Sequence, residues 1–184
     1  MLPIVMHAGL AALWLATTPP SDAPKVVTIN TADEASIVEW DRKVSQLLRR
    51  GDLKLREEKP SDAGKMREEW FVQVHMGVPV VGTEVWRKAE GKKAIAIEGT
   101  IYPSITVNSK PKLSPEEARV VFISLAKGSP GPSQPPVLVI LPQPDRFVLV
   151  YQARVLSGTD LTLYSIDAAT GAVVASEPDP KPAQ

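Results

Sequence analysis

The 184-residue sequence contains no cysteine and only two histidines. Without cysteine the chain forms no disulfide and no thiolate metal site, and it offers no cysteine nucleophile. No HExxH pair is present, so the zinc-and-glutamate site of metalloproteases cannot be assembled from it. No Gly-x-Ser-x-Gly motif accompanies His75, which falls in a predicted strand, where a single histidine is more often solvated than a ligand. We therefore expect no catalytic residue, no metal site and no cofactor, and predict that the protein is not an enzyme.

Neither sign of charge dominates, because 21 basic residues balance 21 acidic ones. A protein without a basic field is not expected to bind nucleic acid. Beyond the N-terminal segment, no run reaches the roughly 18 apolar residues of a membrane helix, so no membrane span is expected in the mature chain. Apolar residues nevertheless make up 43% of the sequence, which is enough for a packed core.

The N-terminus is apolar from Met1 to Ala16, a length that suits the hydrophobic region of a signal peptide. Ser21-Asp22-Ala23 offers small residues for cleavage. We therefore expect residues 1–23 to be a signal peptide and the protein to be secreted or periplasmic. The segment has no Lys or Arg and Pro24 follows the cleavage point, so an apolar leader or a misplaced start codon remains the alternative.

A helix of about 18 residues is predicted between Thr31 and Gly51. Thr31 and Glu34 have the spacing of a capping box, and Gly51 suits the left-handed position that ends a helix. Apolar residues recur at steps of three and four and form one stripe: Ile37, Trp40, Val44 and Leu47.

Four strands are predicted after this helix, at 53–57, 69–76, 80–88 and 94–102. Residues 59–65 read as a loop, and Gly77–Pro79 and Glu90–Lys92 as turns. In the second strand one face is assigned to Trp70, Val72, Val74 and Met76. Gly99 is expected to mark a bulge or a close approach of another backbone.

A second helix is predicted to begin at Ser114, because Pro115 and Glu117 complete a capping box with a proline in the first turn. Its expected buried face comprises Val120, Val121, Ile123 (or Leu125) and Ala126, and Gly128 is expected to end it. Further strands are predicted at 137–141, 147–155, 161–167 and 172–175. The pattern predicts an α+β fold of two helix-plus-antiparallel-sheet units, in the order helix, β-meander, helix, β-meander.

The tryptophans at 40, 70 and 86 all fall inside predicted elements, which favours core positions over a ligand platform. The pattern around Trp86 is weaker, because its strand neighbours alternate poorly between apolar and polar residues. An exposed tryptophan at this position would indicate a docking surface.

Several segments together resemble the pro-region of thermolysin-like secreted metalloproteases. Residues 70–85 are similar to the FTP (fungalysin/thermolysin propeptide) signature, an aromatic strand followed by Gly-Val-Pro-Val and a second glycine. Residues 97–103 and 111–118 resemble the same pro-region. Residues 149–155 and 165–174 are similar to the end of a PepSY module. The resemblance implies an FTP-like domain at 24–112, a PepSY-like domain at 113–175 and a Pro-rich tail at 176–184.

In that family the pro-region helps the protease domain to fold and holds it inactive until cleavage. The resemblance therefore implies a non-catalytic inhibitor or intramolecular chaperone whose partner is a thermolysin-like metalloprotease catalytic domain. This sequence departs from the family's pattern, because no catalytic domain follows Ala175 within it. The protein is thus expected to act in trans or as a zymogen fragment. The alternative is a secreted or envelope binding or structural module that reuses the fold without a protease partner.

The resemblance also implies a contact segment, because in family members the end of the pro-region leads toward the protease cleft. In this chain that segment is Val174, Ala175, Ser176 and Glu177. The alternative is that residues 176–184, which contain three prolines and no apolar pattern, form an unstructured tail.

Overall fold

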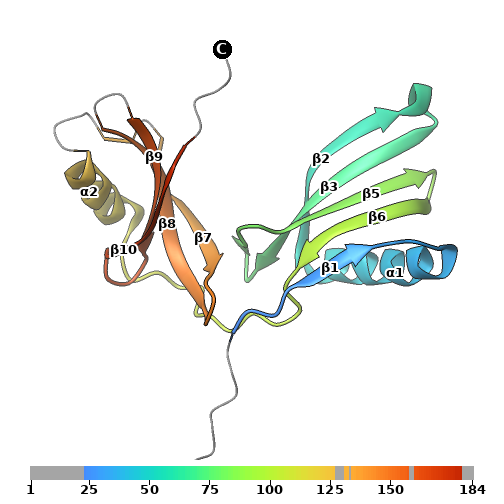
Figure 1. Cartoon of the computed structure of the whole chain (residues 1–184), viewed down its shortest axis with the longest axis horizontal. Helices are drawn as coiled ribbons and strands as arrows, with labels where there is room; N and C mark the ends of the chain where they lie inside the picture. The colour runs from blue at the N-terminus through green and yellow to red at the C-terminus, as the bar shows by residue number, and fades with distance from the viewer. Residues whose placement is uncertain (1–22, 127–130, 133, 158–159, 180–184) are drawn as a thin grey trace, which may run out of the picture.

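The structure, a computed structural model, describes residues 23–126, 131–132, 134–157 and 160–179. It has the predicted α+β composition, with helices packed on antiparallel sheets (Figure 1). The elements follow the chain as β1 (Val27–Asn30), α1 (Glu34–Arg50), β2 (Leu53–Ser61), the short 3-10 helix η1 (Asp62–Gly64), β3 (Met66–His75), β4 (Val78–Pro79), β5 (Glu84–Glu90), β6 (Lys93–Ile101), α2 (Pro115–Leu125), β7 (Val137–Pro142), β8 (Phe147–Ser157), β9 (Asp160–Asp167) and β10 (Val173–Pro178). None of the helices within these ranges is long and apolar enough to cross a membrane.

The first layer is a six-stranded sheet in the order β1-β6-β5-β3-β2, with β4 paired to β3. Helix α1 covers one face and fills a core with the sheet. Val44 of α1 and Val85 and Ile97 of the central strands are almost fully buried there. Among the described residues no helix packs on the opposite face of this sheet (Figure 1).

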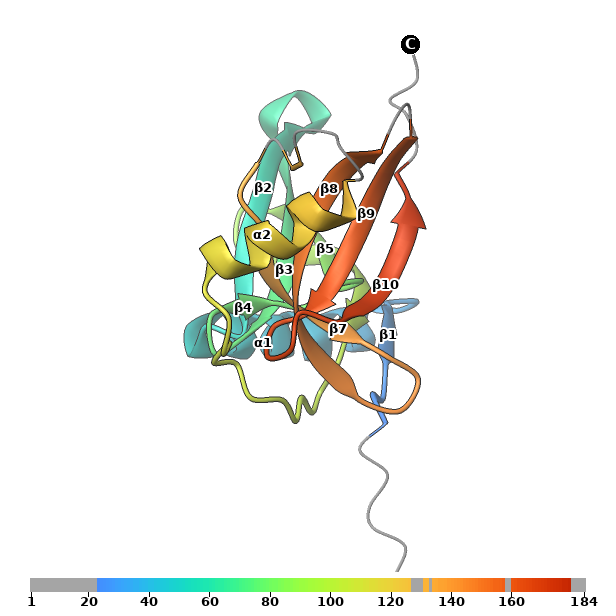
Figure 2. The ribbon, with the colours of Figure 1, turned by 90° about the vertical axis from the view of Figure 1, so that its left-hand side faces the viewer.

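The second layer is a four-stranded sheet in the order β10-β9-β8-β7. Helix α2 lies across one of its faces, as Figure 2 shows. Phe122 of α2 and Ile140 and Ile166 of the sheet are fully buried in the core between them.

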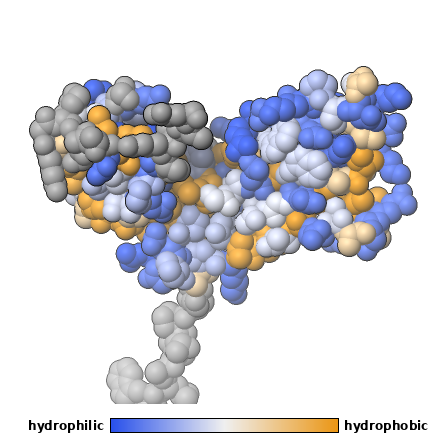
Figure 3. Space-filling view, turned by 45° about the horizontal axis from the view of Figure 1, so that its top comes forward, coloured by the Kyte–Doolittle hydropathy of each residue, from blue (hydrophilic) through white to orange (hydrophobic). Residues whose placement is uncertain are grey.

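The two layers meet where the β3–β4 hairpin reaches the second core. Val80 forms a parallel bridge to Ile140, and the amide of Val81 donates to the Ile140 carbonyl at 2.9 Å. Tyr102 packs edge-on against Phe147, with ring centroids 5.3 Å apart. Figure 3 shows the result as two lobes that join at the centre of the molecule.

The start of α1 differs from the prediction. Asp33, not Thr31, is the N-cap, and it forms a capping box with Ser36 instead of Glu34. The Thr31 hydroxyl accepts from the Ile97 amide at 3.0 Å and donates to the Ile97 carbonyl at 2.9 Å. Thr31 is therefore held by the backbone of β6, and the helix begins two residues later than its sequence suggests.

The rest of α1 confirms the prediction. The helix has 17 residues, and the predicted stripe faces the sheet, with Val44 buried and Ile37, Trp40 and Leu47 half-buried around it. Gly51 ends the helix with φ of 78°.

The strands of the first sheet differ from the prediction in several places. Strand β1, which precedes α1, was not predicted, and β3 begins at Met66 instead of Glu69. Residues 59–61, expected in a loop, continue β2, which tolerates Pro60 because an edge strand can lack one amide donor. The first turn falls at Met76 and Gly77, both with positive φ, rather than at Gly77–Pro79. Val80, expected to begin a strand, lies in the second core instead, and β5 starts at Glu84.

The face of β3 that packs on the first core also differs from the expected one. The tryptophan at 70 suggested its own face, but the core lies on the opposite face. Phe71 is buried against α1, whereas Trp70 and Val72 point to the face without a helix. Trp70 pairs directly with Trp86 of β5, and both are half-buried on that face. The expectation of a core position is therefore wrong for these two tryptophans, and of the three tryptophans that the structure describes only Trp40 packs against the first core. Trp14 lies outside the described residues.

Helix α2 begins as predicted. Ser114 is the N-cap, Glu117 completes the capping box and Pro115 lies in the first turn. Its buried face is predicted in part, because Ala126 is buried and Val121 and Leu125 pack partly buried against the core. The centre of the face is instead Ala118 and Phe122, and Val120 and Ile123 are 66% and 45% exposed. The predicted stop at Gly128 lies outside the described residues.

The strands of the second sheet lie where they were predicted. The last strand, β10, extends three residues past the expected limit at Ala175 and ends at Pro178. Ser176 and Glu177 therefore belong to the sheet.

Candidate functional site

The segment Val174–Glu177, which the resemblance implies as a protein contact, lies in β10 at one edge of the four-stranded sheet. Its inner side pairs with β9, from Val173 opposite Ile166 to Pro178 opposite Thr162. Among the described residues no strand pairs with its outer side. The segment is thus an extended, pre-formed edge rather than an unstructured tail.

A bulge anchors the start of this edge. The register shifts between Val173 and Ala175, so Val174 is the additional residue in β10. The Val174 side chain packs on an apolar cluster of Val139, Val148 and Val150, on the sheet face opposite α2. Val174 therefore fixes β10 by apolar contact, whereas Ser176 and Glu177 are exposed.

The hydrogen-bond register places the backbone of Ser176 on the outer side. The amide of Asp179 donates to the Leu161 carbonyl at 2.9 Å. Hydrogen-bonded pairs alternate along an antiparallel ladder. The pair Glu177–Leu163 therefore exchanges hydrogen bonds with β9, and Ser176, opposite Tyr164, directs its N–H and C=O away from the sheet. Pro178 has no N–H, so Ser176 is the outward donor of this half of the strand.

The turn that precedes β10 is held by one carboxylate. The Asp167 side chain accepts from the amides of Ala169 and Thr170, both at 2.8 Å, and from the Thr170 hydroxyl at 3.0 Å. Burial acts to raise the pKa of Asp167, but these hydrogen bonds outweigh it and hold the pKa below its ordinary value of 3.8. The ionised carboxylate therefore sets the direction in which the chain enters β10.

The far end of β10 is also fastened. Arg154 of β8 donates through Nε to the carboxylate of Asp179 and forms an ion pair with it. Together with the Asp179 amide bond to Leu161, this contact keeps the strand extended up to the last residue that the structure describes. Sequence reasoning missed Arg154, because its partner lies 25 residues away in a segment without an apolar pattern.

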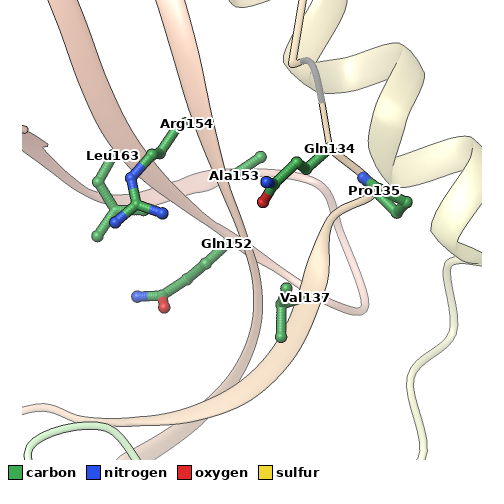
Figure 4. Close-up of a pocket in the computed structure, with 7 residues that line it drawn as sticks. All are labelled: Gln134, Pro135, Val137, Gln152, Ala153, Arg154 and Leu163. Carbon is green, nitrogen blue, oxygen red and sulfur yellow. The ribbon is translucent and has the colours of Figure 1, made fainter.

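A shallow hollow of about 320 Å³ lies on the same sheet face as Ala175 and Glu177. Ala175 continues a cross-strand row through Ser165 to Gln152 and Val137, and Glu177 continues one through Leu163 to Arg154. Figure 4 shows the side chains that surround the hollow: Gln134, Pro135, Val137, Gln152, Ala153, Arg154 and Leu163. The recess thus offers one cation, two amides and several apolar groups on the face that β10 shares, and β9 contributes Leu163 to its lining.

No set of three or more His, Asp or Glu side chains that could hold a metal ion occurs within the described ranges. His75 is half-buried at the end of β3, next to the Met76–Gly77 turn. The candidate site is therefore a surface built from backbone groups and neighbouring side chains.

Comparison with known proteins leaves the family open. No family model matches the sequence, and no curated protein matches it. Among solved structures, the chain is similar to the C-terminal domain of YpeB from Bacillus megaterium, with 19% identity and a TM-score of 0.42 over 87% of this chain and 69% of that one. A similarity at this level assigns neither a family nor a function.

Proposed function

We propose that this protein is a non-catalytic binding protein that contacts a thermolysin-like metalloprotease through the outer edge of β10. It would act as an inhibitor, a folding chaperone or both, in trans or as part of a zymogen. The observation that carries the proposal is the outward-facing backbone of Ser176 at an edge with no neighbouring strand in the described structure.

An exposed strand edge binds proteins through main-chain hydrogen bonds. Its free N–H and C=O groups pair with an extended segment of a partner, and adjacent side-chain recesses supply specificity. Here the hollow beside Arg154 and Leu163 lies on the face that Ala175 and Glu177 share. A partner strand laid along β10 would extend this face of the sheet beyond β10, with β10 between the partner and the hollow.

The ordering of β10 favours affinity. Val174 packs at one end and Asp179 is paired at the other, so the segment is extended before a partner arrives. Binding then loses less conformational entropy than it would with a free tail. Pro178 limits the edge to a short stretch, which is one way in which proteins avoid indiscriminate strand pairing.

The identity of the partner rests on the resemblance of residues 70–85 and 165–174 to the FTP and PepSY segments of protease pro-regions. A protein that binds the folded protease and not the unfolded chain stabilises the folded form by mass action. If the same contact covers the cleft, substrate is excluded. The predicted signal peptide at 1–23 would bring the protein to the compartment of such secreted enzymes.

The test is a titration of the purified full chain into a purified thermolysin-like metalloprotease, with hydrolysis of a small peptide as the readout. The proposal predicts saturable inhibition that is followed by a lag if the inhibitor is digested. Digestion of the chain without inhibition and without a lag would contradict it. That result would favour an envelope binding or structural module without a protease partner.

The chaperone role needs its own measurement. Denatured protease is diluted into refolding buffer with and without the chain, and the yield of active enzyme is measured after removal of the chain. A higher yield supports assistance in folding, and an unchanged yield together with inhibition restricts the role to that of an inhibitor.

A further inference from the structure

The face of the six-stranded sheet opposite α1 carries two tryptophans in one cross-strand row. Register pairs Glu57 with Trp70, Trp70 with Trp86, and Trp86 with Glu98. The row thus has the order acid, indole, indole, acid, and Asn30 of β1 follows Glu98 at the sheet edge.

One half of this row contains a cation supplied by the chain itself. The ammonium of Lys59 lies 5.1 Å from the ring centroid of Trp70 and 2.8 Å from the carboxylate of Glu57. An ammonium over an indole face is attracted by the ring quadrupole, and the carboxylate adds charge attraction. In this half of the row, an indole and a neighbouring carboxylate together bind a cation from the same chain.

The other half has the indole and the acid, but none of the described residues places a cation at the corresponding position. A second cross-strand row runs beside the first, in the order Lys59, Glu68, Lys88 and Ala96. Lys59 is the neighbour of Glu57 in this row, and Ala96 is the corresponding neighbour of Glu98. Lys88 is directed to Glu68 at 3.5 Å. Within the described structure Glu98 is exposed and forms no ion pair.

A hollow of about 310 Å³ adjoins Trp86. Its lining includes two carboxylates, Glu84 and Glu98, and the glycine backbone at 82 and 99. Glu84 already forms an ion pair with Arg56, with 2.5 Å between the guanidinium nitrogen and the carboxylate oxygen, and both side chains are about half exposed. The hollow thus combines the indole of Trp86, the carboxylate of Glu98, which has no ion pair within the described structure, and the carboxylate of Glu84, which is shared with Arg56.

We propose that this hollow binds an arginine side chain of a partner protein, with the guanidinium stacked on Trp86 and paired with Glu98. A guanidinium fits better than an ammonium because it is planar, stacks on aromatic faces and can direct separate N–H donors at Glu98 and Glu84. The surface is complementary in charge to such a group, and the neighbouring Trp70 site accommodates the smaller lysine cation in the same manner.

This proposal extends the proposed binding function by adding a second contact surface, but its test needs no protease, so the two can fail separately. The ligands are N-acetyl-arginine amide and, as a neutral molecule of nearly the same shape, N-acetyl-citrulline amide. Each is titrated into the full chain while the indole N–H signals are followed by NMR. The signals are assigned with Trp70→Phe and Trp86→Phe variants.

The arginine derivative is expected to shift the Trp86 signal in a saturable manner and to leave Trp70 nearly unchanged. Citrulline should produce no saturable shift. Glu98→Gln should weaken binding about fivefold, as expected for loss of one exposed charge pair. Equal responses to arginine and citrulline, or a response at Trp70 alone, would overturn the proposal.

A blocking variant gives an independent test. Ala96→Lys places an ammonium where Lys59 stands in the other half of the row, and should suppress arginine binding by occupying Trp86 and Glu98. Ala96→Gln, of similar size and without charge, should retain binding. Position 96 lies on the sheet face without a helix, so the fold is expected to persist in both variants. Far-ultraviolet circular dichroism would check this. Equal binding by the two variants would contradict the assignment of the site.

Discussion

The guanidinium of Arg87 lies 2.7 Å from the carboxylate of Glu69 on the neighbouring strand, and both side chains are only 11% exposed. Asp41 of α1 accepts from the Nε of the same arginine at 2.7 Å. Burial acts to lower the pKa of Arg87, but the hydrogen bonds to Asp41 and Glu69 outweigh it and raise that pKa. The cation therefore ties the helix to the sheet beneath the tryptophan face.

Glu69→Gln is predicted to destabilise the fold by about 3 kcal/mol, because removing one member of a buried ion pair leaves the other charge without full compensation. The free energy of unfolding is measured by urea denaturation. The control is Glu39→Gln, which removes an exposed pair with Lys43 on α1 and should shift the urea midpoint far less. Similar shifts for the two variants would contradict the structural role of Glu69.

Gly99→Ala is predicted to disrupt the first sheet. A Cβ atom at this position would lie 2.2 Å from the Glu84 carbonyl oxygen and 2.8 Å from the Cα of Val85, and φ is +152°. Both contacts are to backbone, so one strand must move. Gly91→Ala, in a turn with φ of +57° and no atom within 4 Å, is the control. Thermal denaturation should show a lower midpoint for Gly99→Ala than for Gly91→Ala, and the reverse order would refute the close approach.

Stability is predicted to fall at acid pH in part through Asp167. Its pKa is lower in the folded chain than the ordinary value of 3.8. The stabilisation is therefore complete above that ordinary value and is lost as the pH falls through the lower folded pKa. Asp167→Asn should be less stable than the wild type at about pH 7, and the difference should shrink toward about pH 2. A difference independent of pH would show that the charge of Asp167 contributes nothing.

Ser176→Pro is predicted to weaken inhibition of a thermolysin-like protease by about tenfold, the equivalent of about 1.4 kcal/mol of lost main-chain bonding. Proline removes an N–H that points away from β9, so the sheet should be retained. Ser176→Ala keeps that N–H and should inhibit like the wild type. If the proline variant inhibits equally well, the outer edge of β10 is not the contact.

Local chemistry made part of this fold predictable. Ser114, Pro115 and Glu117 act only on neighbouring amides, and the structure has the cap that they indicate. Thr31 has an equally good cap pattern, but its hydroxyl instead hydrogen-bonds to the backbone of Ile97 on β6, 66 residues away. A competing long-range contact of this kind leaves no local signal.

The candidate site was likewise predictable in part from local sequence, whereas the rest depends on long-range contacts. The resemblance indicated Val174–Glu177, and alternation indicated strands near it. The extension of β10 depends on Arg154 and on the register with β9, which no local pattern encodes. The face of the first sheet was assigned wrongly because large apolar side chains such as Trp70 and Val72 occupy the face without a helix.

The most direct test of the central claim is amide hydrogen exchange at Ser176, measured by NMR on the free chain and on its complex with a thermolysin-like protease made inactive by substitution of its catalytic glutamate. The account predicts fast exchange in the free chain, because this amide faces away from β9, and exchange slowed by about tenfold or more in the complex. Unchanged fast exchange at Ser176, in a complex whose formation is shown by other signals, would contradict the claim that the outer edge of β10 binds the partner.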